Sequence, residues 1–161
     1  MAEPLLSNQE VEKLLEIKKF IPRNESFELK PKANAAFEDK SVDLVDDLSN
    51  SYTLIIQRNI RFPGRFCIIF RYNDKKTGKT LRLVRLNRSH EFHVNELEKN
   101  EVRGIHLHRY REEYVRKNLK EDGYAEEIKD IDSISEALGF MVRMLNIRRV
   151  PDSKTTDLFE E

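Results

Sequence analysis

The histidines of this chain are concentrated within nineteen residues, at His90, His93, His106 and His108. Histidine titrates closest to neutral pH of all side chains and is a common metal ligand. One residue separates His106 from His108, so on a β-strand both rings lie on one face, with Cα atoms about 7 Å apart. Tyr110 continues this row, while Leu107 faces the packed side. We therefore expect His93, His106, His108 and Tyr110 to form a catalytic site that borders a cleft or solvent.

Three kinds of chemistry are compatible with this cluster. In the first, His93, His106 and His108 hold a divalent metal ion, because the H-x-H spacing suits two ligands of a tetrahedral or octahedral site. In the second, two imidazoles act as general acid and base on RNA, while arginine stabilises the charge on the phosphorane and Tyr110 orients the phosphate. In the third, the histidines contact a partner without catalysis. No cofactor is predicted apart from the metal ion of the first alternative.

The charges are balanced overall but unevenly distributed. Residues 51–120 carry 17 basic and 7 acidic residues, a net charge of +10, whereas residues 1–50 and 121–161 carry net charges of −4 and −6. A basic segment predicts a surface for a polyanion such as RNA. The acidic ends can equally fold back and neutralise it. The arginines expected to contact nucleic acid are Arg82, Arg85, Arg88, Arg109 and Arg111.

The hydrophobic pattern predicts a single α+β domain over residues 7–150 and a flexible polar tail over 151–161. Capping boxes at Ser7 and Ser133 begin helices that we expect over residues 8–20 and 133–146. Strands are predicted over residues 26–31, 52–59, 66–73, 80–87 and 105–110, and residues 32–50 are ambiguous. These elements predict a four- to five-stranded antiparallel sheet, packed on one face by an N-terminal and a C-terminal helix.

The composition also excludes several classes of protein. The 161 residues suffice for one domain and contain no apolar stretch long enough to span a bilayer. The N-terminus lacks the basic and apolar regions of a signal peptide. A single cysteine, Cys67, cannot form an intrachain disulfide. We therefore expect a cytoplasmic protein without a membrane partner.

Several short motifs together resemble a family of uncharacterised bacterial and mobile-element proteins. The motifs are Leu83-Val-Arg-Leu-Asn87, His93-x-Asn95, and His106-Leu-His108-x-Tyr110-Arg111-Glu112-x-Tyr114, followed by a helix from Leu138 to Asn146. The family pattern has an R-L-D strand, an H-x-N-P-x-G loop and an H-x-H-x-Y-x-E strand. In this chain Asn87 replaces the aspartate, and Glu96-Leu97 replace the Pro-x of the loop. The layout is more distantly similar to the TumE-type toxins of bacterial toxin–antitoxin modules, and that likeness implies a ribonuclease toxin.

The leading hypothesis is an RNA-directed, toxin-like protein of bacterial or phage origin, with clustered histidines at its reaction centre. Its partners would be RNA and a cognate antitoxin. The alternative is a non-catalytic inhibitor or adaptor from a mobile element. Such a protein would bind a host nucleoprotein complex through its charged surfaces.

Overall fold

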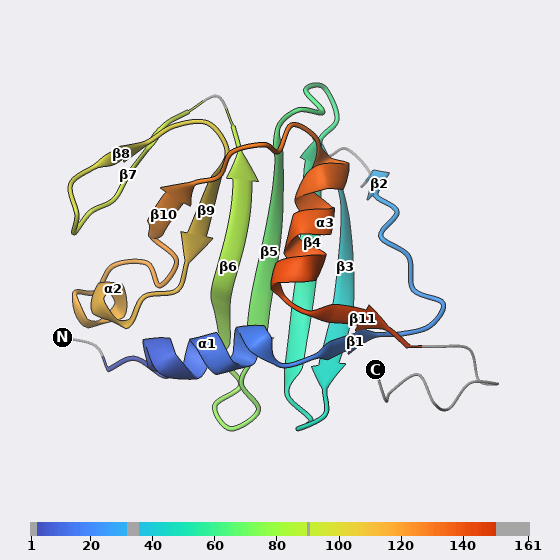
Figure 1. Cartoon of the computed structure of the whole chain (residues 1–161), viewed down its shortest axis with the longest axis horizontal. Helices are drawn as coiled ribbons and strands as arrows, with labels where there is room; N and C mark the ends of the chain where they lie inside the picture. Colours follow the sequence, from blue (N-terminus) through green and yellow to red (C-terminus); the bar gives the residue numbers. More distant parts are fainter. Residues whose placement is uncertain (1–2, 32–35, 90, 151–161) are drawn as a thin grey trace.

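The computed structural model describes residues 3–31, 36–89 and 91–150, which form a mixed helix-and-sheet structure (Figure 1). The helices are α1 (Asn8–Glu16), α2 (Glu112–Arg116) and α3 (Ile134–Met144). The strands of the large sheet are β1 (Lys19–Ile21), β2 (Lys30–Pro31), β3 (Phe37–Asp46), β4 (Ser51–Asn59), β5 (Phe66–Asn73), β6 (Thr80–Arg88), β9 (His106–Arg109), β10 (Tyr124–Glu127) and β11 (Ile147–Arg149). A separate hairpin pairs β7 (His93–Val94) with β8 (Glu101–Val102).

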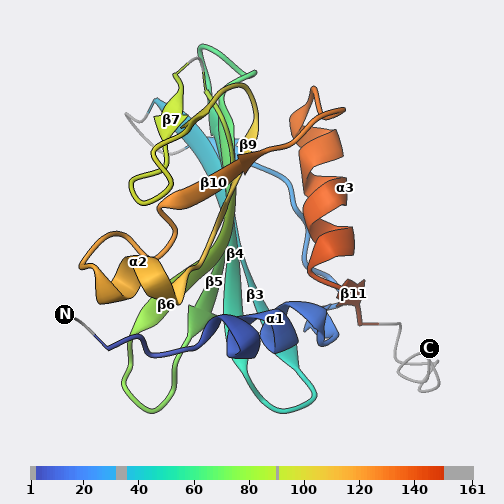
Figure 2. The same ribbon diagram turned by 60° about the vertical axis from the view of Figure 1, so that its left-hand side comes forward.

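The centre of the sheet is the antiparallel meander β3-β4-β5-β6, and β9 and β10 continue it beyond β6. The last three strands of the meander and β9 lie where the alternation of apolar residues predicts them. Their inward side chains, such as Leu54, Phe70 and Leu86, are fully buried. The ring of Phe70 stacks on that of Tyr52 at 5.0 Å. Helices α1 and α3 cover this face, and Figure 2 shows α2 and β7 on the other side of the sheet.

The sheet is larger than predicted, with nine strands rather than four or five, and the described residues form three helices rather than two. Within the ambiguous stretch, residues 37–46 form β3, because buried Val42 and Leu44 alternate with exposed Ser41 and Asp43. The strand predicted over residues 26–31 is limited to β2. Strands β1 and β11 come from opposite ends of the chain and pair in parallel.

Both predicted helix starts are confirmed. The Ser7 hydroxyl accepts the Glu10 N–H while the Glu10 carboxylate accepts the Ser7 N–H. The Ser133 hydroxyl accepts the Glu136 N–H at the start of α3. Helix α1 ends four residues earlier than predicted, because the chain turns into β1 at Lys19. The predicted tail over residues 151–161 lies outside the described residues.

Lys19 links the N-terminal helix α1 to the C-terminal helix α3. Its side chain is fully buried, and Nζ donates to the carbonyls of Leu15 and Leu145, at 2.7 and 2.8 Å. These carbonyls belong to the C-terminal ends of α1 and α3, where a cation is favoured by the helix dipole. Burial nevertheless lowers the pKa of Lys19 to about 7.

The face of the sheet opposite α1 and α3 carries the predicted site, and we call it the polar face. Cross-strand register places Gln57, Cys67, Asn87 and His106 in one row of this face. The next row contains Ile69, Arg85 and His108. The polar face is thus defined by these seven side chains, and the histidines lie at its β9 end.

Candidate functional site

The structure brings three of the four histidines together at the β9 end of the polar face. His106 and His108 project from β9 on the same side, as predicted, and His93 reaches them from the β7–β8 hairpin. The ring centroids of His106 and His108 are 5.0 Å apart. The His93 ring lies 4.7 Å from that of His108 and 5.8 Å from that of His106. His90 lies outside the described residues.

Each ring is bound to a backbone carbonyl through one nitrogen. The contacts are His93 Nε2 to Gly123 O at 2.6 Å, His106 Nδ1 to Gly104 O at 2.9 Å, and His108 Nδ1 to Asp122 O at 2.8 Å. A carbonyl oxygen can only accept a hydrogen bond, so each of these nitrogens must carry the hydrogen. In the neutral rings the lone pair is therefore on the other nitrogen. On His106 this is Nε2, which lies 3.5 Å from the amide nitrogen of Asn87.

The expectation that the histidines border a cleft or solvent is wrong for two of them, because His106 and His108 are each only 2% exposed. Burial, reinforced by the nearby Arg85 guanidinium, lowers the pKa of His108 to about 2. Burial also lowers the pKa of His106. Both rings are consequently neutral at physiological pH. A general acid needs a proton to give, and a general base works best with a pKa near the working pH, so the pair is poorly suited to acid–base chemistry.

The His93-x-Asn95 motif fixes the β7–β8 hairpin against β10. The Asn95 side chain is 1% exposed, and its Oδ1 accepts the Ala125 N–H at 2.8 Å. Its Nδ2 donates to the Ala125 carbonyl, also at 2.8 Å. This is the pair of bonds that a neighbouring antiparallel strand would make. Gly123, which binds His93, lies so close to Tyr114 that a Cβ there would be 2.9 Å from that ring.

Tyr110 does not continue the histidine row, which corrects its predicted place in the site. Strand β9 ends at Arg109, and the Tyr110 ring turns into the main core. Its hydroxyl donates to the Leu6 carbonyl at 2.7 Å and accepts the Leu6 N–H at 3.3 Å. These bonds hold the segment that leads into α1.

The remaining residues of the motif also make tertiary contacts. Glu112 accepts the Asn8 N–H at 2.6 Å, and the Glu112 N–H donates to the Asn8 side chain at 2.8 Å. The Tyr114 hydroxyl donates to Glu98 at 2.6 Å, in the turn of the β7–β8 hairpin. The motif from His106 to Tyr114 therefore ties both the N-terminal helix and this hairpin to the sheet.

Three of the five arginines predicted to bind nucleic acid are neutralised by acidic residues. Arg85 Nε donates to Asp122 Oδ2 at 2.9 Å, and Arg82 Nε lies 3.5 Å from the same atom. Arg109 pairs with Glu126 at 2.9 Å, on the face opposite the histidines. The acidic partners come from the C-terminal third of the chain. That third therefore does fold back on the basic middle, as the second interpretation of the charge distribution expected.

Arg88 and Arg111 make no ion pair among the residues that the structure describes. Arg88 Nη1 donates to the Asp132 carbonyl at 2.7 Å. The Arg111 guanidinium lies 4.8 Å from the centroid of the Tyr124 ring.

Asp122 is the site residue that the sequence did not reveal. It is fully buried, and its Oδ1 has no hydrogen-bond partner among the described residues. Asp followed by Gly is an ordinary turn sequence, so the position gives no sign that the carboxylate is buried against two arginines.

The metal-ion alternative finds no assembled donor set in the described part of the chain. No group of three His, Cys, Asp or Glu side chains there is arranged to hold a metal ion. His106 Nε2 faces the Asn87 amide instead.

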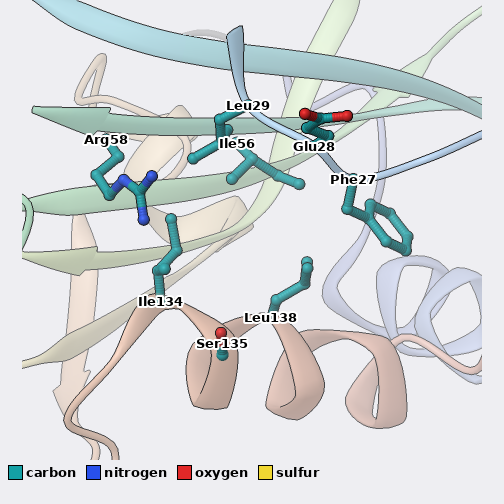
Figure 3. A pocket seen from close by; sticks show the side chains of 8 residues that line it. All are labelled: Phe27, Glu28, Leu29, Ile56, Arg58, Ile134, Ser135 and Leu138. Carbon is teal, nitrogen blue, oxygen red and sulfur yellow. The ribbon is translucent and has the colours of Figure 1, made fainter. Parts of the chain in front are cut away.

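A separate cavity of about 380 Å³ lies on the helix side of the sheet, between α3, β4 and the segment before β2 (Figure 3). Its apolar lining residues are Phe27, Leu29, Ile56, Ile134 and Leu138. Arg58 also lines it, but its guanidinium is bound to Glu38. The cavity and the histidines lie on opposite sides of the sheet, so the cavity is separate from the histidine site.

Residues 6–149 match a family of unknown function, DUF6978. The chain belongs to this family. No curated protein and no solved structure gives a significant match. Within the described ranges, none of the helices has the length and apolar character needed to cross a membrane. The likeness to TumE-type toxins stays a prediction.

Proposed function

We propose that this protein is a non-catalytic adaptor that binds a nucleoprotein partner through its charged surface, and that its histidine cluster is a structural clamp. The observation that carries the proposal is the use of the imidazole rings as donors to backbone carbonyls. The burial of His106 and His108 also supports it, because a large substrate such as RNA cannot reach them in this conformation.

The distribution of unpaired charge supports the binding role. Acidic residues neutralise Arg82, Arg85 and Arg109. Arg61, Arg65 and Arg88, in contrast, have no carboxylate partner among the described residues and gather at one end of the sheet. An unneutralised cluster of arginines favours a polyanionic partner.

Matched substitutions at His93 and His108 test the clamp. Gln at 93 can place its Nε2 where the histidine Nε2 donates, and Asn at 108 can do the same for Nδ1. We expect H93Q and H108N to unfold close to the wild type, whereas H93A and H108A lose about 1–3 kcal/mol because a buried carbonyl loses its donor. Urea unfolding measures this difference. Cleavage of labelled RNA by the wild type that is lost in H93Q would contradict the non-catalytic assignment.

Sedimentation tests the adaptor role. A tagged chain in bacterial lysate is expected to sediment with a large nucleoprotein particle at low salt and to return to the top of the gradient at high salt, because screening weakens charge contacts. A chain that stays at the top at low salt would contradict the proposal.

The toxin-like ribonuclease is the second candidate, and one observation favours it. Three imidazoles from two separate segments converge within 6 Å of one another beside the Arg85 guanidinium. Catalysis would require the β7–β8 hairpin to open, because it covers two of the rings. This candidate predicts that expression of the wild type arrests bacterial growth and that H93Q relieves the arrest. Equal growth with both chains would count against it.

A further inference from the structure

The turn between β4 and β5, residues 60–65, carries side chains that the histidine site does not use. It projects from the end of the sheet opposite α1 (Figure 1). Ile60 and Phe62 in this turn are each 46% exposed, and Phe37 beside it is 50% exposed. Exposed apolar groups that gather in one place mark an interaction site more often than scattered ones.

Arginines surround the exposed Phe62 ring. The Arg65 guanidinium lies 4.3 Å from its centroid, and that of Arg61 lies at 5.6 Å. Arg88 comes from the end of β6 and lies against the turn, with its Nη1 3.5 Å from where a Cβ on Gly64 would be. Within the described ranges, none of the three arginines has a carboxylate partner. Two guanidinium groups therefore contact one solvent-exposed aromatic ring, and Arg88 lines the same hollow as that ring.

Two hollows adjoin these arginines. One of about 430 Å³ is lined by the turn together with Arg88 and Ser89. The other, of about 230 Å³, lies on the polar face and reaches Cys67 and Asn87. Arg65 and Arg88 line both hollows, so a ligand that extends from one hollow into the other passes these two residues.

We propose that this turn surface binds single-stranded RNA of the nucleoprotein partner, and the proposal rests on the adaptor function above. The turn surface consists of Phe37, Ile60, Arg61, Phe62, Arg65 and Arg88. The Phe62 ring stacks on an unpaired base, and the arginines contact the flanking phosphates. Charge alone would suit any polyanion, but an exposed aromatic ring between guanidinium groups favours a strand whose bases are splayed out, which in RNA are found in loops and ends.

Fluorescence anisotropy of a labelled single-stranded RNA of about 12 nucleotides with the purified full chain tests the proposal. The double variant R61S/R65S should bind about tenfold or more weakly, and the dependence of log affinity on log salt should lose about one unit per arginine. F62A should bind about fivefold or more weakly with an unchanged salt slope, because stacking releases no counterions. Arg61 and Phe62 are exposed and Arg65 is half-buried, and unchanged thermal unfolding shows that the variants are folded.

The chain offers a matched control in the β7–β8 hairpin. There the Arg103 guanidinium lies 5.1 Å from the Phe92 centroid, and Phe92 is 52% exposed. Arg103 is neutralised by Glu101 at 3.0 Å. R103S and F92A should therefore bind RNA as the wild type does.

Several outcomes would overturn the proposal. Equal affinity of the wild type and R61S/R65S would place RNA elsewhere, and equal affinity for a duplex of the same length would exclude stacking. Equal affinity for the matching DNA strand would overturn the assignment to RNA. Sedimentation separates this proposal from the adaptor function. A chain that binds no RNA but still sediments with nuclease-treated particles keeps the adaptor function and loses the RNA contact, whereas a chain that does neither loses both.

Discussion

His106 and His108 act as neutral hydrogen-bond donors. Their neutrality follows from burial, which penalises the charged imidazolium more than the neutral ring. The sequence could predict that the two rings share a face, because the period of a strand is two. It could not predict their burial, because the β7–β8 hairpin that covers them is held by contacts between segments that are distant in sequence. These contacts join His93 to Gly123 and Asn95 to Ala125.

The lowered pKa of His108 predicts loss of stability in acid. The pKa of His108 is about 2 in the folded protein and has the ordinary histidine value of 6.5 in the unfolded chain. Between these two pH values the unfolded chain therefore binds more protons than the folded one. The free energy of unfolding should therefore fall as the pH drops below about 6.5, by up to about 1.4 kcal/mol per pH unit for this group. Urea unfolding at pH 7, 6 and 5 measures the slope. H108N should flatten it, and equal slopes in the two proteins would contradict the prediction.

The central elements could be predicted because each carries its own periodic signal. Strands β4, β5 and β6 are eight or nine residues long, and each has buried residues at every second position over part of its length, most regularly in β5. Strands β1 and β11 have three residues each, too few to show a period. They form because Lys19 and its neighbours pair with Ile147 and the residues after it. Short strands near a sheet edge thus depend on tertiary contacts that one sequence does not display.

Lys19 predicts a pH dependence at the junction of α1, β1 and α3. The pKa of Lys19 is about 7 in the folded protein and has the ordinary lysine value of 10.5 in the unfolded chain. Between these two pH values the unfolded chain therefore binds more protons than the folded one. The free energy of unfolding should rise from about pH 7 toward pH 10, by up to about 1.4 kcal/mol per pH unit. In K19M this rise should disappear. Guanidinium unfolding at pH 7, 8 and 9 checks both proteins, and a rise that persists in K19M would assign it to another group.

Over the whole molecule, opposite charges from distant segments meet. Glu38 binds Arg58, Asp122 binds Arg85, and Glu126 binds Arg109. The net charges of the three segments predicted that these segments could neutralise one another, but they could not show which arginines would stay free. That outcome depends on register: Arg85 lies beside β9, next to the segment that carries Asp122, whereas Arg61 and Arg65 lie at the far turn.

Asp122 predicts a specific stability loss. D122N removes the buried carboxylate that accepts from Arg85 and lies beside Arg82, so the free energy of unfolding should fall by about 1.5–3 kcal/mol. Glu121 is the matched control, because its side chain is 21% exposed and 3.6 Å from Arg82. E121Q should change stability by less than about 1 kcal/mol. Thermal and urea unfolding of both variants measures the difference, and equal losses would show that burial of the carboxylate is not the cause.

The Asn95 side chain has a consequence for self-association. A strand at the border of a sheet normally offers unpaired backbone groups that recruit a strand from another molecule, and polymers can grow in this way. On β10 the N–H and carbonyl of Ala125 are already bound by one amide, so these two groups are not open to a second copy. A single side chain thus occupies the outward backbone groups of Ala125, and a strand from a second copy would have to displace it in order to pair with β10 at this residue.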